Sequence, residues 1–211
     1  MANDTVYLDK NGNMKTMQEL LAGKTQEQQQ VIKYFFEMGS GCCGGPMKDE
    51  DYKAMVEKVR GSGDYKQRAL DKVGVDEDMV QEIPPVTFEG FSADKAYAKR
   101  TTTGNWITSK YEITWLFFGD EQVYLYSYAF FMDDGSKKEE TNEYFYKDIT
   151  SFSTASDMTE STTSKGKETV ETHVFRMVVP GDKFICSMEA TPNTANALAA
   201  MKQKLREKKN M

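Results

Sequence analysis

Two adjacent cysteines, Cys42 and Cys43, are the residues whose types and spacing most directly suggest chemistry. They lie in the glycine-rich segment GSGCCGGP, which spans residues 39–46. A thiol near backbone N–H groups and the start of a helix can have a lowered pKa, which makes it reactive. Adjacent thiols can also form a vicinal disulfide or bind a soft metal ion. The pair is therefore a candidate for a redox, metal-binding or catalytic role.

The same segment also has a structural interpretation as a hinge between two helices. Glycine frees the backbone, and Pro46 fixes the exit from the segment. This interpretation explains the glycines without using the thiols, so we favour it. A thiol-dependent redox or soft-metal-binding activity at Cys42 and Cys43 is the alternative function.

The remaining cysteine and the single histidine give little support for catalysis. Cys186 alternates with Phe184 and Met188, which predicts a buried thiol on a strand. One imidazole, that of His173, cannot supply the ligands of a typical catalytic zinc site. The sequence contains no phosphate-binding, nucleophile-elbow, zincin or dinucleotide motif. We therefore assign no catalytic residue, metal or cofactor and favour a protein that is not an enzyme, with the activity at Cys42 and Cys43 as the open alternative.

Charge and hydropathy exclude further classes of function. The formal net charge of -6 argues against nucleic acid as a partner, because such binding relies on a basic surface. No run approaches the roughly 18 apolar residues of a membrane-spanning helix. The start, MANDTVYLDKNGN, lacks the basic and apolar regions of a secretory signal. We therefore expect a soluble, cytoplasmic protein.

Residues 1–83 predict a small helical module that contains the glycine-rich loop. In DEDYKAMVEKVRG, apolar residues recur with helical spacing from Tyr52 to Val59, and DYKQRALDKVGV repeats the pattern before its glycine. Thr25 and Gln28 have capping-box spacing at the start of TQEQQQVIKYFFEMG. The other expected helices are MKTMQELL and a short one from Asp76 to Ile83.

After Pro85 the spacing changes to period two, which predicts strands. Seven are expected, near residues 86–91, 108–118, 122–132, 138–147, 149–156, 169–179 and 183–190. The polar segment SDMTESTTSKGKET between the fifth and sixth predicts a mobile loop. A final amphipathic helix follows Thr191, with Leu198, Met201 and Leu205 along one stripe.

Seven antiparallel strands followed by one amphipathic helix is the element order of the pleckstrin-homology superfold. Residues 86–211 resemble this family, particularly its bacterial and GRAM-like members, in that order and in the polar-to-apolar step of EYFYKDITSFSTAS. The resemblance implies an α+β fold. A helical module (1–83) precedes a seven-stranded antiparallel bent sheet or barrel (84–211), which the C-terminal helix caps. A lipocalin-like or other small barrel is the alternative.

The best-known activity of this family, phosphoinositide binding, is not expected here. The resemblance assigns Lys110 to the first basic position, but the following turn carries Asp120 and Glu121. No further basic residue appears before Lys137, and acidic groups would repel a polyanionic headgroup. We therefore predict a non-enzymatic binding or interaction module that recognises a protein and binds phosphoinositides weakly or not at all.

The segment EQVYLYSYAFFMDDG has apolar or aromatic side chains on both faces of its expected strand. Tyr124, Tyr126, Tyr128 and Phe130 share one face, and such a face left exposed usually marks an interface. We predict that VIKYFFEM or the helices after it pack on this face. The alternative is a homodimer in which two such faces meet.

Overall fold

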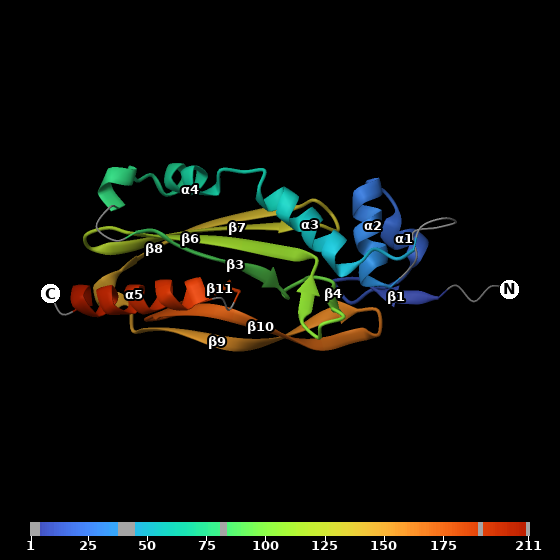
Figure 1. Cartoon of the computed structure of the whole chain (residues 1–211). Coiled ribbons are helices and arrows are strands. Elements are labelled where there is room, and N and C mark those ends of the chain that lie inside the picture. Colours follow the sequence, from blue (N-terminus) through green and yellow to red (C-terminus); the bar gives the residue numbers. More distant parts are fainter. Residues whose placement is uncertain (1–4, 38–44, 81–83, 190–191, 210–211) are drawn as a thin grey trace.

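The structure is a computed structural model that describes residues 5–37, 45–80, 84–189 and 192–209. It has an α+β fold with mostly antiparallel sheets, and the described strands do not close into a barrel. The elements form layers, with α-helices above the larger sheet and a long hairpin with the last helix below it (Figure 1). The β1 strand (Val6–Leu8) and the C-terminal part of α5 (Pro192–Lys209) lie at opposite ends of the molecule (Figure 1).

The larger sheet is an antiparallel four-stranded sheet with the order β3-β6-β7-β8. Its strands are β3 (Val86–Ser92), β6 (Lys110–Phe118), β7 (Gln122–Phe131) and β8 (Lys137–Phe145). The tight turn between β6 and β7 is closed by a hydrogen bond of 3.0 Å from Gly119 N to Gln122 O. Short turns of this kind keep consecutive strands adjacent.

The smaller sheet has the order β11-β10-β9, and it corrects one prediction. Its strands are β9 (Ser151–Thr163), β10 (Gly166–Val179) and β11 (Asp182–Ser187). The segment SDMTESTTSKGKET, predicted to be a mobile loop, forms the distal half of the β9–β10 hairpin. Backbone pairing is continuous to its tip, and Val170, Ser161 and Thr162 are buried there. The segment lacks the apolar alternation typical of a strand, and backbone hydrogen bonds between β9 and β10 together with these buried side chains stabilise it instead.

Two small hairpins were also not predicted. The first, β1 (Val6–Leu8) with β2 (Met14–Thr16), lies in a segment expected to be helical. The Asp9 carboxylate accepts hydrogen bonds from the Asn11 and Asn13 backbone, and Gly12 has φ +84, the left-handed region that favours glycine. The second hairpin, β4 (Ala98–Arg100) with β5 (Trp106–Thr108), is inserted between β3 and β6.

The helices begin and end largely where the local pattern indicates. They are α1 (Met17–Leu21), α2 (Gln26–Phe35), α3 (Asp49–Arg60), α4 (Tyr65–Val73), α5 (Pro192–Lys209) and the 3-10 turns η1 (Glu77–Val80) and η2 (Tyr146–Asp148). The capping box of Thr25 and Gln28 is confirmed at the start of α2. Gly74 ends α4 with φ +71.

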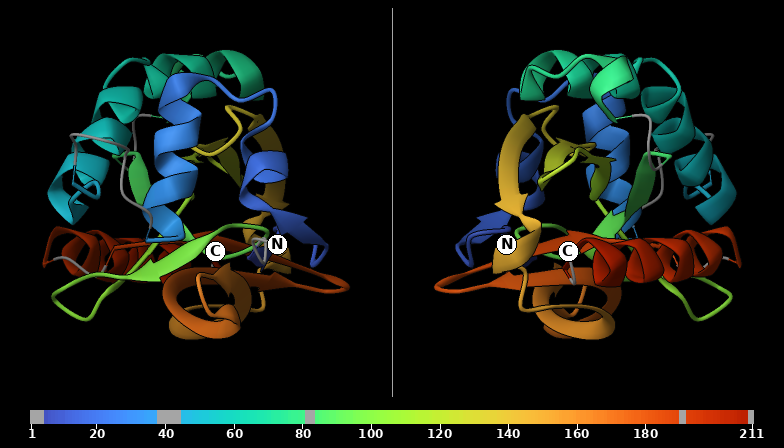
Figure 2. Two further views of the ribbon diagram at one scale, coloured as in Figure 1. Left: turned by 90° about the vertical axis from the view of Figure 1, so that its right-hand side faces the viewer. Right: turned by 90° about the vertical axis from the view of Figure 1, so that its left-hand side faces the viewer.

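Two apolar clusters hold the layers together. The first lies between the helices and the larger sheet, and it joins side chains of α2, α3 and α4 to Tyr126, Tyr128 and Phe130 of β7. The structure therefore places helices on the tyrosine-rich face, which is the packing that we predicted. The second cluster lies between the two sheets, and Met201 and Leu205 of α5 are buried in it. Figure 2 shows the helices on one side of the larger sheet and α5 with the β9–β10 hairpin on the other.

Candidate functional site

The β4–β5 hairpin crosses the distal part of the β9–β10 hairpin and forms the centre of the candidate site (Figure 1). A parallel bridge between Tyr97 and Thr162 fixes one side of the crossing. Trp106 of β5 packs against a small buried cluster of Ala93, Ala98 and Val170. The hairpin therefore rests on β10 through Trp106.

The loop of this hairpin is tied to the helical layer by Asp49, the first residue of α3. One carboxylate oxygen of Asp49 accepts a hydrogen bond of 2.9 Å from Thr102 N, and the other accepts one of 2.8 Å from the Tyr34 hydroxyl. Burial acts to raise the pKa of Asp49, but these hydrogen bonds outweigh it and lower the pKa below its ordinary value. The base of the hairpin is held as well, because the Tyr52 hydroxyl donates to Thr108 O at 2.7 Å.

Two clefts flank the hairpin. The first has a volume of about 540 Å³ and lies between the hairpin, α3, β10 and the end of β11. Its apolar part is formed by Phe91, Ile107 and Met188, and His173 lies at its edge. The second cleft has a volume of about 430 Å³ and lies between the hairpin and the tip of β9–β10.

Arg100 and Trp106 line both clefts and separate them. The Arg100 guanidinium lies 5.2 Å from the centroid of the Trp106 ring, within the range of a cation–π interaction. Arg100 is exposed and Trp106 is half-buried. A planar cation held on an indole ring presents both charge and apolar surface, the combination that protein interfaces favour.

The charges of the two clefts differ. Lys53 and Arg100 line the first cleft together with Glu171 and Glu189. Burial raises the pKa of Glu189, and the negative charge of Glu89 raises it further.

The second cleft has an excess of positive charge. Lys99, Arg100 and Lys165 line it with only two carboxylates, those of Glu37 and Glu168. The Glu168 carboxylate is already engaged, because it accepts a hydrogen bond of 2.5 Å from the Thr163 hydroxyl. Lys99 is engaged as well, because its ammonium lies 4.3 Å from the centroid of the Tyr34 ring, so Arg100 is the cation shared with the first cleft.

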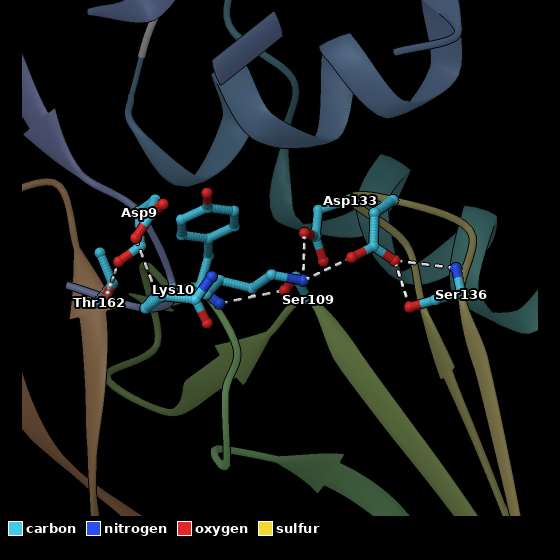
Figure 3. Close-up of polar contacts among 9 residues, drawn as sticks. Asp9, Lys10, Ser109, Asp133, Ser136 and Thr162 are labelled. Carbon is cyan, nitrogen blue, oxygen red and sulfur yellow. Dashed lines mark hydrogen bonds and ion pairs between the residues drawn. The ribbon is translucent and has the colours of Figure 1, made fainter. Parts of the chain in front are cut away.

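A buried polar cluster supports the base of the β4–β5 hairpin from the other side (Figure 3). The Lys10 ammonium forms ion pairs of 2.7 Å with Asp133 and 2.8 Å with Asp134. Ser109, just after β5, accepts a hydrogen bond from Tyr97 N at 3.1 Å. The cluster thereby joins the β1–β2 turn, the hairpin base and the β7–β8 turn.

Burial raises the pKa of Asp133, although the Lys10 ammonium acts in the opposite direction. Burial acts to lower the pKa of Lys10, but Asp133 and Asp134 outweigh it and raise the pKa. Asp133 Oδ1 is buried and accepts no hydrogen bond from any described residue. We assign this cluster a structural role, because an ion pair of this kind positions the elements that carry its charges.

The residues predicted from sequence lie elsewhere or have other roles. Cys42 and Cys43 lie outside the described residues. Cys186 is buried on β11, as predicted, and burial raises the pKa of its thiol well above the ordinary value. Within the described ranges, no group of three or more His, Cys, Asp or Glu side chains could hold a metal ion.

The tyrosine-rich face, which was predicted to be a candidate interface, is buried within the chain. Tyr126, Tyr128 and Phe130 are at most 2% exposed because the chain's own helices cover them. Tyr124 is half-buried and packs against the same cluster. These side chains therefore pack against the chain's own helices, which is the first of the two arrangements predicted from the sequence.

Sequence reasoning missed the β4–β5 hairpin and both clefts. A turn signal was present in RTTTGNW, where Gly104 adopts φ +88. The flanking strands have only three residues each, too few for a period-two pattern to be recognised.

Comparisons with known proteins give no relative for this chain. No family model, no curated protein and no solved structure matches it. Among the helices of the described residues, none combines the length and the apolar character needed to cross a membrane.

Proposed function

We propose that this protein is a non-enzymatic binding module of pleckstrin-homology-like architecture that recognises a protein partner at the two clefts beside the β4–β5 hairpin. The element order supports the architecture. Four strands of one antiparallel sheet are followed by three of another, and then by a helix whose apolar stripe is buried with both sheets. The β4–β5 hairpin and the helical layer are additions to this pattern.

One observation carries the functional part of the proposal. Arg100 and Trp106 lie between clefts of about 540 and about 430 Å³. One cationic and one aromatic side chain therefore line both adjoining clefts. Arginine and tryptophan are the residue types that most often dominate protein–protein binding energy. Catalysis has no comparable support, because His173 is the only imidazole of the chain.

The proposal includes weak or absent phosphoinositide binding. Lys110, which the resemblance assigns to the first basic position, is buried. Its ammonium lies 3.9 Å from Asp94 and 5.7 Å from the centroid of the Phe131 ring. A buried lysine that already faces a carboxylate is poorly placed to bind a phosphate group.

The thiol-dependent alternative at Cys42 and Cys43 has no support from the described residues, since both cysteines lie outside them. Its test is mass spectrometry and metal analysis of the purified protein with and without reductant. A vicinal disulfide or a bound metal would favour that alternative over the binding module.

Affinity capture with a charge-reversed cleft tests the proposed function. The full chain, Arg100→Glu and the control Lys58→Glu are used as baits under identical conditions. Arg100 and Lys58 are both exposed, so both changes are tolerated by the fold and alter the net charge equally. We expect Lys58→Glu to retain the proteins that the unaltered chain captures and Arg100→Glu to lose them. Equal capture by all three baits, or headgroup-specific binding to phosphoinositide vesicles, would contradict the proposal.

A further inference from the structure

The β10 strand has an open edge along the two clefts. On one side, β9 pairs with it from Gly166 to Val178. On the other side, β11 pairs only with Val174–Val179, and one further hydrogen bond of 2.9 Å joins Met188 N to His173 O. In the part of the chain that the structure describes, no strand lies beside β10 on that side between Gly166 and Thr172.

The backbone groups on this edge have a defined direction. In an antiparallel sheet, the N–H and C=O of one residue point to the same neighbouring strand, and those of the next residue point to the other. The carbonyl of His173 points to the β11 side, because it accepts from Met188 N. Thr169 and Glu171 therefore direct their N–H and C=O groups to that same, unpaired side.

The clefts follow this edge in order. Glu171, Thr172 and His173 line the first cleft beside the end of β11, and Glu168 and Thr169 line the second. A strand that continued the line of β11 would therefore pass both clefts. The β4–β5 hairpin forms their opposite wall, so the space suits one extended chain rather than the edge of another sheet.

The edge strand β8 of the larger sheet is protected in a way that this edge is not. β8 carries Lys137, Lys138, Glu139, Glu140 and Glu143, and charged side chains on an edge strand oppose pairing with another chain. β10 carries charge at Lys167, Glu168 and Glu171, but Thr169 and Val170 between them are uncharged. This segment is available for backbone pairing.

We propose that an extended peptide segment of the partner protein binds as an added strand along Thr169–Glu171, antiparallel to β10 and in line with β11. This inference rests on the proposed function. The peptide places an apolar side chain in the first cleft and an acidic side chain beside Arg100, where the two clefts meet. Phe91, Ile107 and Met188 receive the apolar group, and the Arg100 guanidinium attracts the acidic one.

The register gives the spacing of these two peptide residues. Even-numbered residues of β10 from 168 to 172 point to the hairpin, because Val170 lies in the cluster beneath Trp106. A peptide side chain opposite Thr172 lies on this same face over the first cleft, and the next one on this face, opposite Val170, lies beside the Arg100–Trp106 pair. An acidic side chain at that position does not directly face the Glu168 carboxylate, as one two residues further along would. An antiparallel peptide therefore carries its acidic residue two positions after its apolar residue.

The test selects peptides from a random library on the full-length protein and measures their affinity by fluorescence polarisation. We expect selected peptides to contain an apolar residue followed, two positions later, by Asp or Glu. Arg100→Glu should weaken their binding at least tenfold, whereas Lys58→Glu should leave it unchanged. Enriched peptides with neither feature would overturn the inference.

Backbone pairing has its own readout. N-methylation of peptide amides that face β10 should abolish binding, and N-methylation at the alternate positions should not. Hydrogen exchange at the Thr169 and Glu171 amides should slow on binding, while the Val170 amide, which already faces β9, stays unchanged.

The two proposals fail in different ways. If peptides bind, depend on Arg100 and tolerate N-methylation at every position, strand addition is wrong and the proposed function stands. If the affinity capture is lost in Arg100→Glu but no linear peptide is selected, the partner is a folded surface and the peptide inference is again wrong. If Arg100→Glu affects neither capture nor peptide binding, both proposals are overturned.

Discussion

The Tyr34 hydroxyl donates a hydrogen bond of 2.8 Å to Asp49, whose second carboxylate oxygen binds the backbone N–H of Thr102 at 2.9 Å. One carboxylate thus connects α2, α3 and the loop of the β4–β5 hairpin. Its position in the first turn of α3 is also favoured by the helix dipole. The candidate site depends on this connection, because the hairpin forms one wall of each cleft.

Asp49→Asn should lower the free energy of unfolding by about 1–3 kcal/mol at pH 7, since it weakens two hydrogen bonds to a charged acceptor. The folded-state pKa of Asp49 is lowered, so its contribution is complete above the unfolded-state value and disappears as the pH falls through the folded-state pKa. Urea denaturation from pH 7 to pH 2 should therefore show the difference between wild type and variant shrinking in acid. Glu50→Gln, an exposed neighbour, is the control. A constant difference at every pH would contradict the assignment.

Tyr52→Phe should destabilise the protein by about 1–2 kcal/mol, because it leaves the buried Thr108 carbonyl without the hydroxyl donor at 2.7 Å. Tyr52 is fully buried, so water cannot replace that donor. Equilibrium unfolding in urea measures the change. Tyr124→Phe is the matched control, since among the described residues its hydroxyl makes no hydrogen bond. Equal stability of the two variants would show that the Tyr52 hydroxyl contributes nothing.

Lys10→Met should cost about 3–5 kcal/mol, because it leaves the Asp133 carboxylate buried beside no cation. Adding Asp133→Asn should recover part of this loss, which a double-mutant cycle measures. Lys15→Met is the control, since that ammonium is more exposed and lies 3.6 Å from Asp9. Additive effects of the two single changes would disprove the coupling.

The Lys10→Met variant should also be less destabilised in mild acid. Burial already raises the folded-state pKa of Asp133, and loss of the Lys10 charge should raise it further. A carboxyl group whose pKa is raised in the folded state lowers the free energy of unfolding of the protein as the pH rises from the unfolded-state pKa to the folded-state pKa. Denaturation at pH 5 and pH 8 should therefore give the larger loss at pH 8, and the opposite order would refute this cause.

Gly90→Ala should destabilise the junction of the two sheets by about 1–3 kcal/mol. A Cβ atom at this position would lie 3.1 Å from the carbonyl carbon of Met188 and 3.3 Å from Glu189 N, both backbone atoms that cannot move alone. Thermal unfolding measures the effect, with Thr87→Ala on the same strand as the control. A variant as stable as Thr87→Ala would show that the junction has room for the methyl group.

A fragment of residues 84–211 should not behave as a stable monomer. Removal of the helices would expose Tyr126, Tyr128 and Phe130, which are buried in the shared cluster. Size-exclusion chromatography with light scattering should detect association, and thermal unfolding should show a lower midpoint. A monomeric fragment with the midpoint of the full chain would contradict the role of this packing.

Much of the secondary structure was accessible from local patterns. The capping residues Thr25 and Gln28 and the glycine at position 74 mark helix ends because these groups act on backbone atoms within a few residues. Alternating aromatic residues likewise predicted β7, and their two apolar faces required a covering layer on each side. These features depend on neighbours in the chain.

The distal β9–β10 hairpin could not be predicted in this way. Its serine, threonine and glutamate side chains have no apolar alternation, and its stability comes from backbone pairing and from Val170 beneath Trp106. The chemistry suggested by Cys42 and Cys43 falls outside the described residues. The tyrosines proposed as an interface are used within the core.

The helices and most of the strands therefore followed from residue types and spacing, because these depend on local conformation. The candidate site did not, since Lys53, Arg100, His173 and Glu189 belong to four separate parts of the chain. Only the crossing of the β4–β5 hairpin over β10 brings them to one cleft. That crossing is decided by the packing of Trp106 on Val170 and by the hydrogen bond between Thr102 and Asp49, both of which join residues more than 50 positions apart.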